Sequence, residues 1–289
     1  MSESPRGMLI LGSGGLVGTE VARVAHERSI AYRALRHAEC DIASAKQVGA
    51  AISKSGYGTV INCAAYNAVD QAEVEGEAAL RSNRDGAANV ARLARTVVHY
   101  STDFVFSGTS QTPYHERDLP QPQSAYARSK FAGDGEIQRL NPRHFLMRVG
   151  CLYGAAGKGF GSTLLLRLQA GERIRADCDR QLQPTWARCV AVQTFTLLQT
   201  EHFGLYHVMC HGQTTWADFG REFARLAGFD PMLIDSASTA SLAAVAPRPA
   251  YAVLENRALA DLRLDRMPTW QEALTGYLAE ALSGNGGLK

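Results

Sequence analysis

Short apolar runs alternate with amphipathic segments through the first half of the chain. The apolar runs are of buried-strand type and predict strands at residues 8–11, 31–35, 59–65, 97–101 and 144–148. Apolar residues at helical spacing, and a stretch rich in Ala, Glu, Arg and Leu, predict helices at residues 16–28, 44–54, 73–95 and 124–140, the third with a break near 83–86. This alternation predicts a parallel sheet with helices on both faces, a doubly wound α/β fold.

Three glycines follow the first predicted strand. The segment Leu-Ile-Leu-Gly-Ser-Gly-Gly-Leu-Val-Gly places Gly12, Gly15 and Gly18 between that strand and the next helix. Glycine lets the turn adopt unusual dihedrals and lets a diphosphate approach the backbone, while the first N–H groups and the helix dipole favour its negative charge. The spacing differs slightly from the more common dinucleotide fingerprint, and a structural turn in any α/β unit can carry the same residues. Its place near the start of the chain favours dinucleotide binding.

The pattern loosens after about residue 150. Helices are predicted at residues 163–170, 187–199, 216–227 and 270–282, strands at 173–176 and 205–209, a flexible glycine-rich loop at 154–161 and a loose tail at 283–289. We therefore expect a dinucleotide-binding Rossmann domain over residues 1–150. A smaller C-terminal α/β substrate-binding region is expected over residues 151–289, partly interleaved with the first.

Composition narrows the function classes. The 289 residues are 46% hydrophobic and 20% charged, as in an ordinary globular protein, and the net charge of +2 includes no basic tract of the kind that nucleic-acid binding needs. No apolar stretch reaches the length of a membrane span, and residues 1–7 are too short and polar for a signal peptide, so we expect a cytoplasmic protein without a membrane partner. Six scattered cysteines without a Cys-x-x-Cys pair predict reduced thiols. His207, Cys210 and His211 lack the spacing of a zinc site, and we expect no metal.

The end of the second predicted strand bears on the cofactor. An acidic side chain there would hold a ribose 2′-hydroxyl and repel a 2′-phosphate. This chain offers Arg33, Arg36 and His37, and no acid before Glu39. The sequence therefore favours NADPH, with NADH possible; the alternative is that these cations belong only to the solvated surface.

A phenol and an ammonium lie four residues apart on one predicted helix. Tyr126 and Lys130 share a helix face, and a nearby cation moves the pKa of a phenol from about 10 toward a useful acid–base range. Lys130 can also reach a nicotinamide ribose. Ser101 and Thr102 end a predicted strand at the carboxyl edge of the sheet, where doubly wound folds bind ligands. The alternatives are an exposed helical pair and a local capping hydroxyl.

Together these motifs resemble those of the extended short-chain dehydrogenases/reductases, and specifically those of the dTDP-4-dehydrorhamnose reductase family. The similarity runs through nearly the whole chain. Its markers are the glycine turn, Asp41-Ile42, Tyr126 with Lys130, and the segments 60–66, 68–70, 99–106, 152–154, 184–185, 204–207, 215–219 and 248–249.

The resemblance implies roles for individual residues. Tyr126 is expected to be the proton donor, Lys130 its partner and Thr102 the hydroxyl that tunes it. The expected cofactor contacts are Gly12, Gly15, Leu16, Val17, Gly18, Arg36, Asp41, Ile42, Ala64, Ala65, Tyr66, Tyr126 and Lys130. The expected substrate contacts are Thr102, Asp103, Cys151 and Arg248.

Several positions depart from the family pattern. Where the family usually has a tryptophan for the sugar, this chain has Cys151, which removes a stacking surface. The segment 179–185 lacks the usual glycine, and the acid after the catalytic lysine is Asp134 in place of glutamate. These changes indicate a working reductase whose substrate pocket has drifted.

The main hypothesis is that the protein is an NAD(P)H-dependent reductase of the 4-keto group of a nucleotide-linked deoxysugar. The expected reaction converts dTDP-4-dehydro-L-rhamnose to dTDP-L-rhamnose. One alternative is reduction of a different nucleotide-linked keto sugar in a specialised pathway. Another is a non-catalytic nucleotide-binding regulatory subunit, as in the methionine adenosyltransferase subunit that shares the resemblance. We expect a monomer or homodimer.

Overall fold

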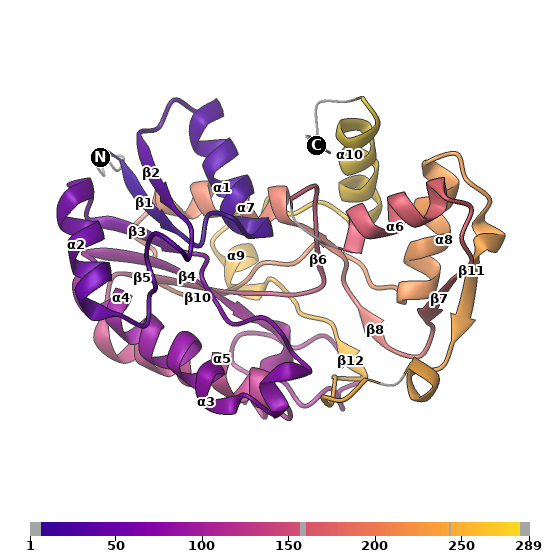
Figure 1. Cartoon of the computed structure of the whole chain (residues 1–289), viewed down its shortest axis with the longest axis horizontal. Coiled ribbons are helices and arrows are strands. Elements are labelled where there is room, and N and C mark those ends of the chain that lie inside the picture. Colours follow the sequence, from indigo (N-terminus) through magenta and orange to yellow (C-terminus); the bar gives the residue numbers. More distant parts are fainter. Residues whose placement is uncertain (1–6, 157–159, 243, 284–289) are drawn as a thin grey trace.

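A six-stranded parallel sheet forms the centre of the computed structural model, which describes residues 7–156, 160–242 and 244–283. The strand order is β10-β5-β4-β3-β1-β2 (Figure 1). The strands are β1 (Met8–Leu11), β2 (Tyr32–Leu35), β3 (Thr59–Asn62), β4 (Thr96–Thr102), β5 (His144–Val149) and β10 (Gly204–His207). The predicted doubly wound α/β fold is confirmed.

Helices cover both faces of this sheet. One face carries α1 (Leu16–Glu27) and α7 (Ala187–Leu198), and the other carries α2 (Ala45–Ser55), α4 (Gly86–Leu93) and α5 (Ala125–Leu140). Strand β1 shows why its sequence is apolar throughout. Met8 and Ile10 pack into the cluster that contains α1 and α7, while Leu9 and Leu11 pack into the cluster on the opposite face.

The predicted break near residues 83–86 is wrong. The helix runs on from α3 (Gly76–Leu80) through a π-helical turn, η2 (Arg81–Asp85), into α4. Gly86 is needed for close packing, because a Cβ atom there would lie 2.6 Å from Cγ1 of Ile42. A glycine inside this helix therefore marks a contact with a neighbouring segment and does not end the helix.

The C-terminal half adds small elements beside the sheet. Its helices are α6 (Phe160–Gln169), α8 (Trp216–Leu226), α9 (Arg257–Asp261) and α10 (Trp270–Leu282). Three parallel pairs join β6 (Leu152–Tyr153) to β9 (Thr185–Trp186), β7 (Ile174–Asp177) to β11 (Ile234–Ala237), and β8 (Gln181–Leu182) to β12 (Tyr251–Ala252). Short 3-10 segments are η1 (Gln71–Glu73), η3 (Asp103–Val105), η4 (Pro231–Leu233) and η5 (Thr239–Leu242).

The two halves of the chain are interleaved. Strand β10 completes the central sheet beside β5, and α7 packs on α1, although both come after residue 150. An ion-pair group also joins α1, α7 and α10: Arg188 lies 2.9 Å from Glu27 and 3.3 Å from Glu280. A boundary at residue 150 therefore separates the two regions only in part.

Parts of two sequence predictions lie outside the described residues, namely 157–159 of the glycine-rich loop and 284–289 of the tail. Within the described part, we find no helix with the length and apolar character that a membrane crossing requires.

Candidate active site

The glycine turn after β1 can close only with glycine at two of its positions. Gly12 has φ +75°, and a Cβ atom there would lie 2.5 Å from the backbone nitrogen of Ala64. A Cβ atom on Gly18 would lie 2.4 Å from the carbonyl oxygen of Gly12. Helix α1 begins beyond Gly15, and no side chain caps its N-terminus. The first N–H groups of α1 are thus available to an anion.

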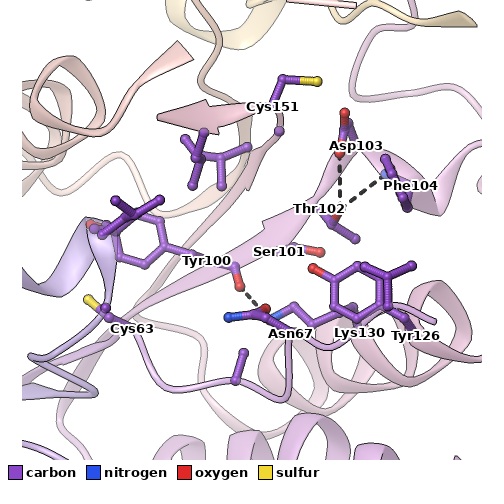
Figure 2. Close-up of a pocket in the computed structure, with 18 residues that line it drawn as sticks. Cys63, Asn67, Tyr100, Ser101, Thr102, Asp103, Phe104, Tyr126, Lys130 and Cys151 are labelled. Carbon is purple, nitrogen blue, oxygen red and sulfur yellow. Dashed lines mark hydrogen bonds between the residues drawn. The ribbon is translucent and has the colours of Figure 1, made fainter. Parts of the chain in front are cut away.

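A cavity of about 460 Å³ lies between this turn and the carboxyl ends of β4 and β5 (Figure 2). The expected residues that line it are Gly15, Leu16, Val17, Ala65, Thr102, Asp103, Tyr126, Lys130 and Cys151, together with the candidate hydroxyl residue Ser101. Lining residues that the sequence reasoning missed are Cys63, Asn67, Val69, Tyr100, Phe104, Val149, Gly150 and Leu152. Three of the missed residues, Cys63, Val149 and Gly150, end a strand of the sheet or directly follow one.

Several expected cofactor residues do not line the cavity but lie around the turn. Gly12 and Gly18 shape the turn, and Ala64 packs against it. Arg36 is exposed, and its Cγ lies 3.7 Å from the position of a Cβ atom on Gly14. The side chain that was expected to face a 2′-phosphate is therefore beside the glycine turn.

Three further expected residues make contacts of their own. Oδ1 of Asp41 accepts a hydrogen bond from the backbone of Ala43 at 3.0 Å, and Ile42 is buried. The phenol of Tyr66 donates to Glu75 at 2.8 Å, in a contact outside the cavity lining. These residues hold the loops that flank the cavity.

Arg248 is paired with a carboxylate at the rim and is absent from the cavity lining. Its two terminal nitrogens lie 2.9 and 2.8 Å from the two oxygens of Asp70. Asp70 also accepts backbone hydrogen bonds from Val245 and Ala246, and the Arg248 guanidinium holds the pKa of Asp70 down at about 2. Because Asp70 follows Val69 of the cavity wall, this ion pair ties the C-terminal region to the rim.

The three expected catalytic residues come together (Figure 2). Ser124 caps the N-terminus of α5, so Tyr126 lies in the first turn of that helix, and its ring meets Phe104 edge-on at 6.2 Å. Its phenol lies beside Thr102 at the end of β4 (Figure 2). One helical turn later, buried Lys130 donates from Nζ to the carbonyl oxygen of Tyr100 at 2.6 Å.

The expectation that Lys130 lowers the pKa of the phenol is wrong for this structure. Burial raises the pKa of Tyr126 above its ordinary value, the nearby hydroxyl of Thr102 opposes that rise, and the charges of Asp103 and Asp134 add to it. The ammonium of Lys130 is instead directed at a backbone carbonyl. A phenol with a raised pKa stays protonated at neutral pH, which suits a proton donor.

Asp103 and Cys151 form the wall across from Tyr126. Oδ1 of Asp103 accepts a hydrogen bond from Thr102 at 3.0 Å, and burial raises the pKa of Asp103 to about 7. Gly150 makes room for this carboxylate, since a Cβ atom there would lie 2.2 Å from its Cγ. Cys151 follows with φ +47°, and burial raises the pKa of its thiol well above the ordinary value, so it stays neutral.

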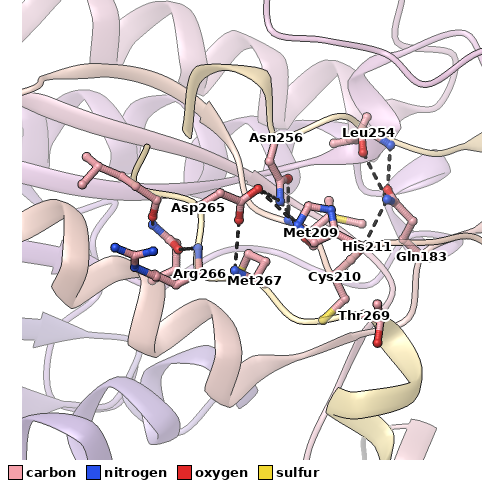
Figure 3. Close-up of polar contacts among 12 residues, drawn as sticks. Gln183, Met209, Cys210, His211, Leu254, Asn256, Asp265, Arg266, Met267 and Thr269 are labelled. Atoms are coloured by element: carbon pink, nitrogen blue, oxygen red, sulfur yellow. Dashed lines mark hydrogen bonds and ion pairs between the residues drawn. The ribbon is translucent and has the colours of Figure 1, made fainter. Parts of the chain in front are cut away.

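Two buried side-chain amides hold the segment that carries Met209 and Cys210 (Figure 3). Gln183 donates to the carbonyl oxygens of Cys210 and Leu254, both at 3.1 Å. Asn256 accepts from the backbone N–H of Met209 and donates to its carbonyl oxygen. The segment 179–185, which lacks the family's glycine, thus supplies a structural contact through Gln183.

The residues considered as metal ligands have other partners. His207 is buried with Nδ1 at 3.2 Å from the carbonyl oxygen of Tyr114, whereas His211 forms an ion pair with Asp265. Over residues 7–156, 160–242 and 244–283, no group of three His, Cys, Asp or Glu residues is arranged to hold a metal ion.

A Rossmann sheet with a glycine turn, a tyrosine and lysine one helical turn apart and a strand-end hydroxyl defines the extended short-chain dehydrogenase/reductase class. Comparison with known proteins narrows this class. Residues 6–283 match the family model described as RmlD substrate binding domain, and the chain belongs to this family of dTDP-4-dehydrorhamnose reductases.

Individual relatives cover nearly the whole chain. It is 33% identical to dTDP-4-dehydrorhamnose reductase of Streptomyces griseus, over 99% of this chain and 98% of that protein. It is 34% identical to a probable dTDP-4,6-dihydroxy-2-methyloxan-3-one 4-ketoreductase of Streptomyces antibioticus, over 95% of both chains. The crystal structure of dTDP-4-dehydrorhamnose reductase from Bacillus anthracis in complex with NADP superposes with a TM-score of 0.92 at 29% identity, over 96% of this chain and 99% of that one.

Proposed function

We propose that this protein uses NADPH to reduce the 4-keto group of a dTDP-linked deoxysugar, converting dTDP-4-dehydro-L-rhamnose to dTDP-L-rhamnose. The observation that carries the proposal is the meeting of Tyr126, Thr102 and Lys130 in one cavity beside the glycine turn. A purely nucleotide-binding protein needs the turn but has no use for a proton donor beside a strand-end hydroxyl.

The residues present fit a dinucleotide. The uncapped N-terminus of α1 at Gly15 offers N–H groups to a diphosphate, and Leu16 and Val17 line the adjoining part of the cavity. Lys130 lies farther along the same cavity, where its ammonium can reach a ribose hydroxyl. When bound there, the reduced nicotinamide supplies the hydride.

The protein's own residues supply the proton and the orientation. Tyr126 donates its phenolic proton to the carbonyl oxygen as that oxygen gains negative charge. Thr102, which lies beside the phenol, provides a second hydroxyl for the same oxygen. Lys130, whose ammonium donates to the carbonyl oxygen of Tyr100, holds the cofactor beside this proton donor.

NADPH preference is part of the proposal, supported by exposed Arg36 beside the glycine turn. Glu39 is closer to this position than its place in the sequence suggests, since Oε2 accepts a hydrogen bond from the backbone N–H of Arg36 at 2.9 Å. This backbone contact engages one oxygen of the Glu39 carboxylate, and the proposed NADPH preference rests on Arg36. Comparing kcat/KM for NADPH and NADH tests the preference.

One observation favours a second substrate. Cys151 replaces a large stacking side chain in the cavity wall, which leaves room for a sugar of different substitution or stereochemistry. A keto sugar linked to dTDP, other than the rhamnose precursor, is therefore the second candidate.

A substrate panel tests both candidates. Purified protein is mixed with NADPH and each of a set of dTDP- and UDP-linked 4-keto sugars, and loss of NADPH absorbance is followed. The proposal expects turnover with dTDP-4-dehydro-L-rhamnose; faster turnover with another 4-keto sugar selects the second candidate. No turnover with any member contradicts both and favours the regulatory-subunit alternative. The proposal also includes a cytoplasmic location and a monomeric or homodimeric state, which fractionation and sedimentation check.

A further inference from the structure

A buried carboxylate behind the cavity has no role in the reaction as described so far. Asp134 lies four residues after Lys130 on α5, so the two side chains share a helix face. Only 1% of Asp134 is exposed. Its Oδ2 accepts a hydrogen bond from Ser101 of β4 at 2.8 Å and lies 3.6 Å from Nε of Arg148 on β5.

The ion pair between Asp134 and Arg148 leaves several polar atoms of the two side chains without a hydrogen bond to any residue that the structure describes. Arg148 places its guanidinium 5.2 Å from the ring centre of Phe106, and its Nε and Nη1 have no hydrogen-bond partner among the described residues. Oδ1 of Asp134 likewise has none within the described part of the chain. The ion pair with Arg148 therefore leaves Oδ1 of Asp134 without a hydrogen-bond partner among the described residues. The charge of Asp134 also raises the pKa of Lys130.

Among the residues that the structure describes, no other carboxylate contributes to the pKa of Lys130. Cys63, after β3, and His99, on β4, both interact with its charge, but burial raises the pKa of the thiol and lowers that of the imidazole, so both stay neutral. Tyr126 on the same helix is a protonated phenol. Across α5, the charged side chains of η2 are exposed, and Arg84 and Asp85 form an ion pair with each other.

We propose that Asp134 is a positioning residue that keeps the buried ammonium of Lys130 charged, and so able to hold the cofactor; this rests on the proposed reductase function. Ser101 and Arg148 keep the carboxylate ionised and in place. Asp134 stands where the family usually has glutamate, and its side chain is one methylene shorter. Ser101 and Arg148 contact this shorter side chain.

The direction of each effect agrees with this role. Burial lowers the pKa of Lys130 to about 8, and Asp134 is the largest contribution that raises it. Burial also raises the pKa of Asp134, while Arg148, Ser101 and Lys130 each oppose that rise. Removing the negative charge of Asp134 removes the largest effect that opposes burial. The pKa of Lys130 then falls further, and Lys130 becomes neutral at a lower pH.

The titration of Lys130 can be measured directly because the chain has only five lysines. Protein labelled with ¹³C-lysine is titrated by NMR, and the Lys130 signal is assigned by its absence from Lys130→Met. We expect Asp134→Asn to lower the pKa of Lys130 by about 1 to 3 units. Asp134→Glu is expected to restore it close to the parent value, and Asp85→Asn, on exposed η2, is expected to leave it unchanged.

An unchanged pKa of Lys130 in folded Asp134→Asn overturns the proposal. Should that variant not fold, Asp134→Asn with Arg148→Gln removes both charges of the pair and leaves no buried charge without its partner. A downward shift is again expected because the carboxylate is gone, and its absence in the folded double variant also overturns the proposal.

Cofactor binding gives the second readout. NADPH affinity of Asp134→Asn is expected to fall at neutral pH and to return as the pH is lowered below the new pKa of Lys130, while Asp134→Glu follows the parent curve. A loss of affinity that is independent of pH indicates a merely structural role and contradicts the proposal. The lysine titration needs no substrate, so its outcome is independent of the substrate panel. If the pKa of Lys130 shifts as expected but no sugar in the panel is reduced, the reductase function fails and this inference about Asp134 and Lys130 does not.

Discussion

Replacing Tyr126 by phenylalanine removes the proposed proton donor and little else. The ring meets Phe104 edge-on at 6.2 Å, and phenylalanine can keep that contact. The change removes the phenolic hydroxyl beside Thr102, and Thr102 retains its hydrogen bond to Asp103. The variant is therefore expected to fold and to bind NADPH nearly as the parent does.

The expected loss is that of general acid catalysis. A positioned acid typically contributes about 10² to 10⁴ in rate, which corresponds to about 3 to 5 kcal/mol of transition-state stabilisation. We expect the single-turnover rate of hydride transfer in Tyr126→Phe to fall by that factor. Lys130→Met is expected to lower both this rate and NADPH affinity, because its ammonium acts on both.

Stopped-flow measurement of NADPH oxidation, with NADPH affinity measured separately, tests this reasoning. Tyr251→Phe is a matched control, since its phenol contacts Gln213 outside the cavity. Its rate is expected to equal that of the parent. A Tyr126→Phe protein that reduces its sugar at the parent rate would refute the mechanism.

Three further predictions concern the cofactor, the buried acid and metals. NADPH should give a higher kcat/KM than NADH, and Arg36→Asp should shift the ratio toward NADH; an equal or larger value with NADH in the parent refutes the assignment. Asp103 has a folded-state pKa raised to about 7, so the native state holds a proton that the unfolded state releases, and stability falls as pH rises from about 4 to about 7. Asp103→Asn should therefore raise the thermal midpoint more at pH 8 than at pH 5, and an equal change at both contradicts the shift. EDTA should leave turnover intact; full, reversible loss of activity contradicts a metal-free reaction.

Much of the central sheet was predictable from sequence because its strands are buried on both faces. Continuous apolar runs such as Met8–Leu11 identify such strands, and the boundaries of α10 follow from its capping Thr269 and its apolar spacing. The strands β6, β8, β9 and β12 have two residues each, too few to show a periodicity. The π-helical turn was missed because Gly86 reads as a helix breaker, whereas its contact with Ile42 depends on tertiary packing.

The site was predictable where its residues lie on motifs. The glycine turn, Thr102, Tyr126 and Lys130 each belong to a recognisable local pattern, and all except the two shaping glycines line the cavity. Val149, which ends β5, and Gly150, which follows it, were missed although residues at the carboxyl ends of parallel strands share one edge. The pairing of Arg248 with Asp70 joins positions 178 residues apart, which no local pattern shows.

The most direct test of the account is where the hydride goes. The protein is incubated with dTDP-4-dehydro-L-rhamnose and NADPH that carries deuterium at the transferable position, and the product is examined by NMR and mass spectrometry. The account predicts dTDP-L-rhamnose with one deuterium at C4 of the sugar. Deuterium at another carbon, or a sugar recovered unreduced while the protein binds NADPH, would contradict it.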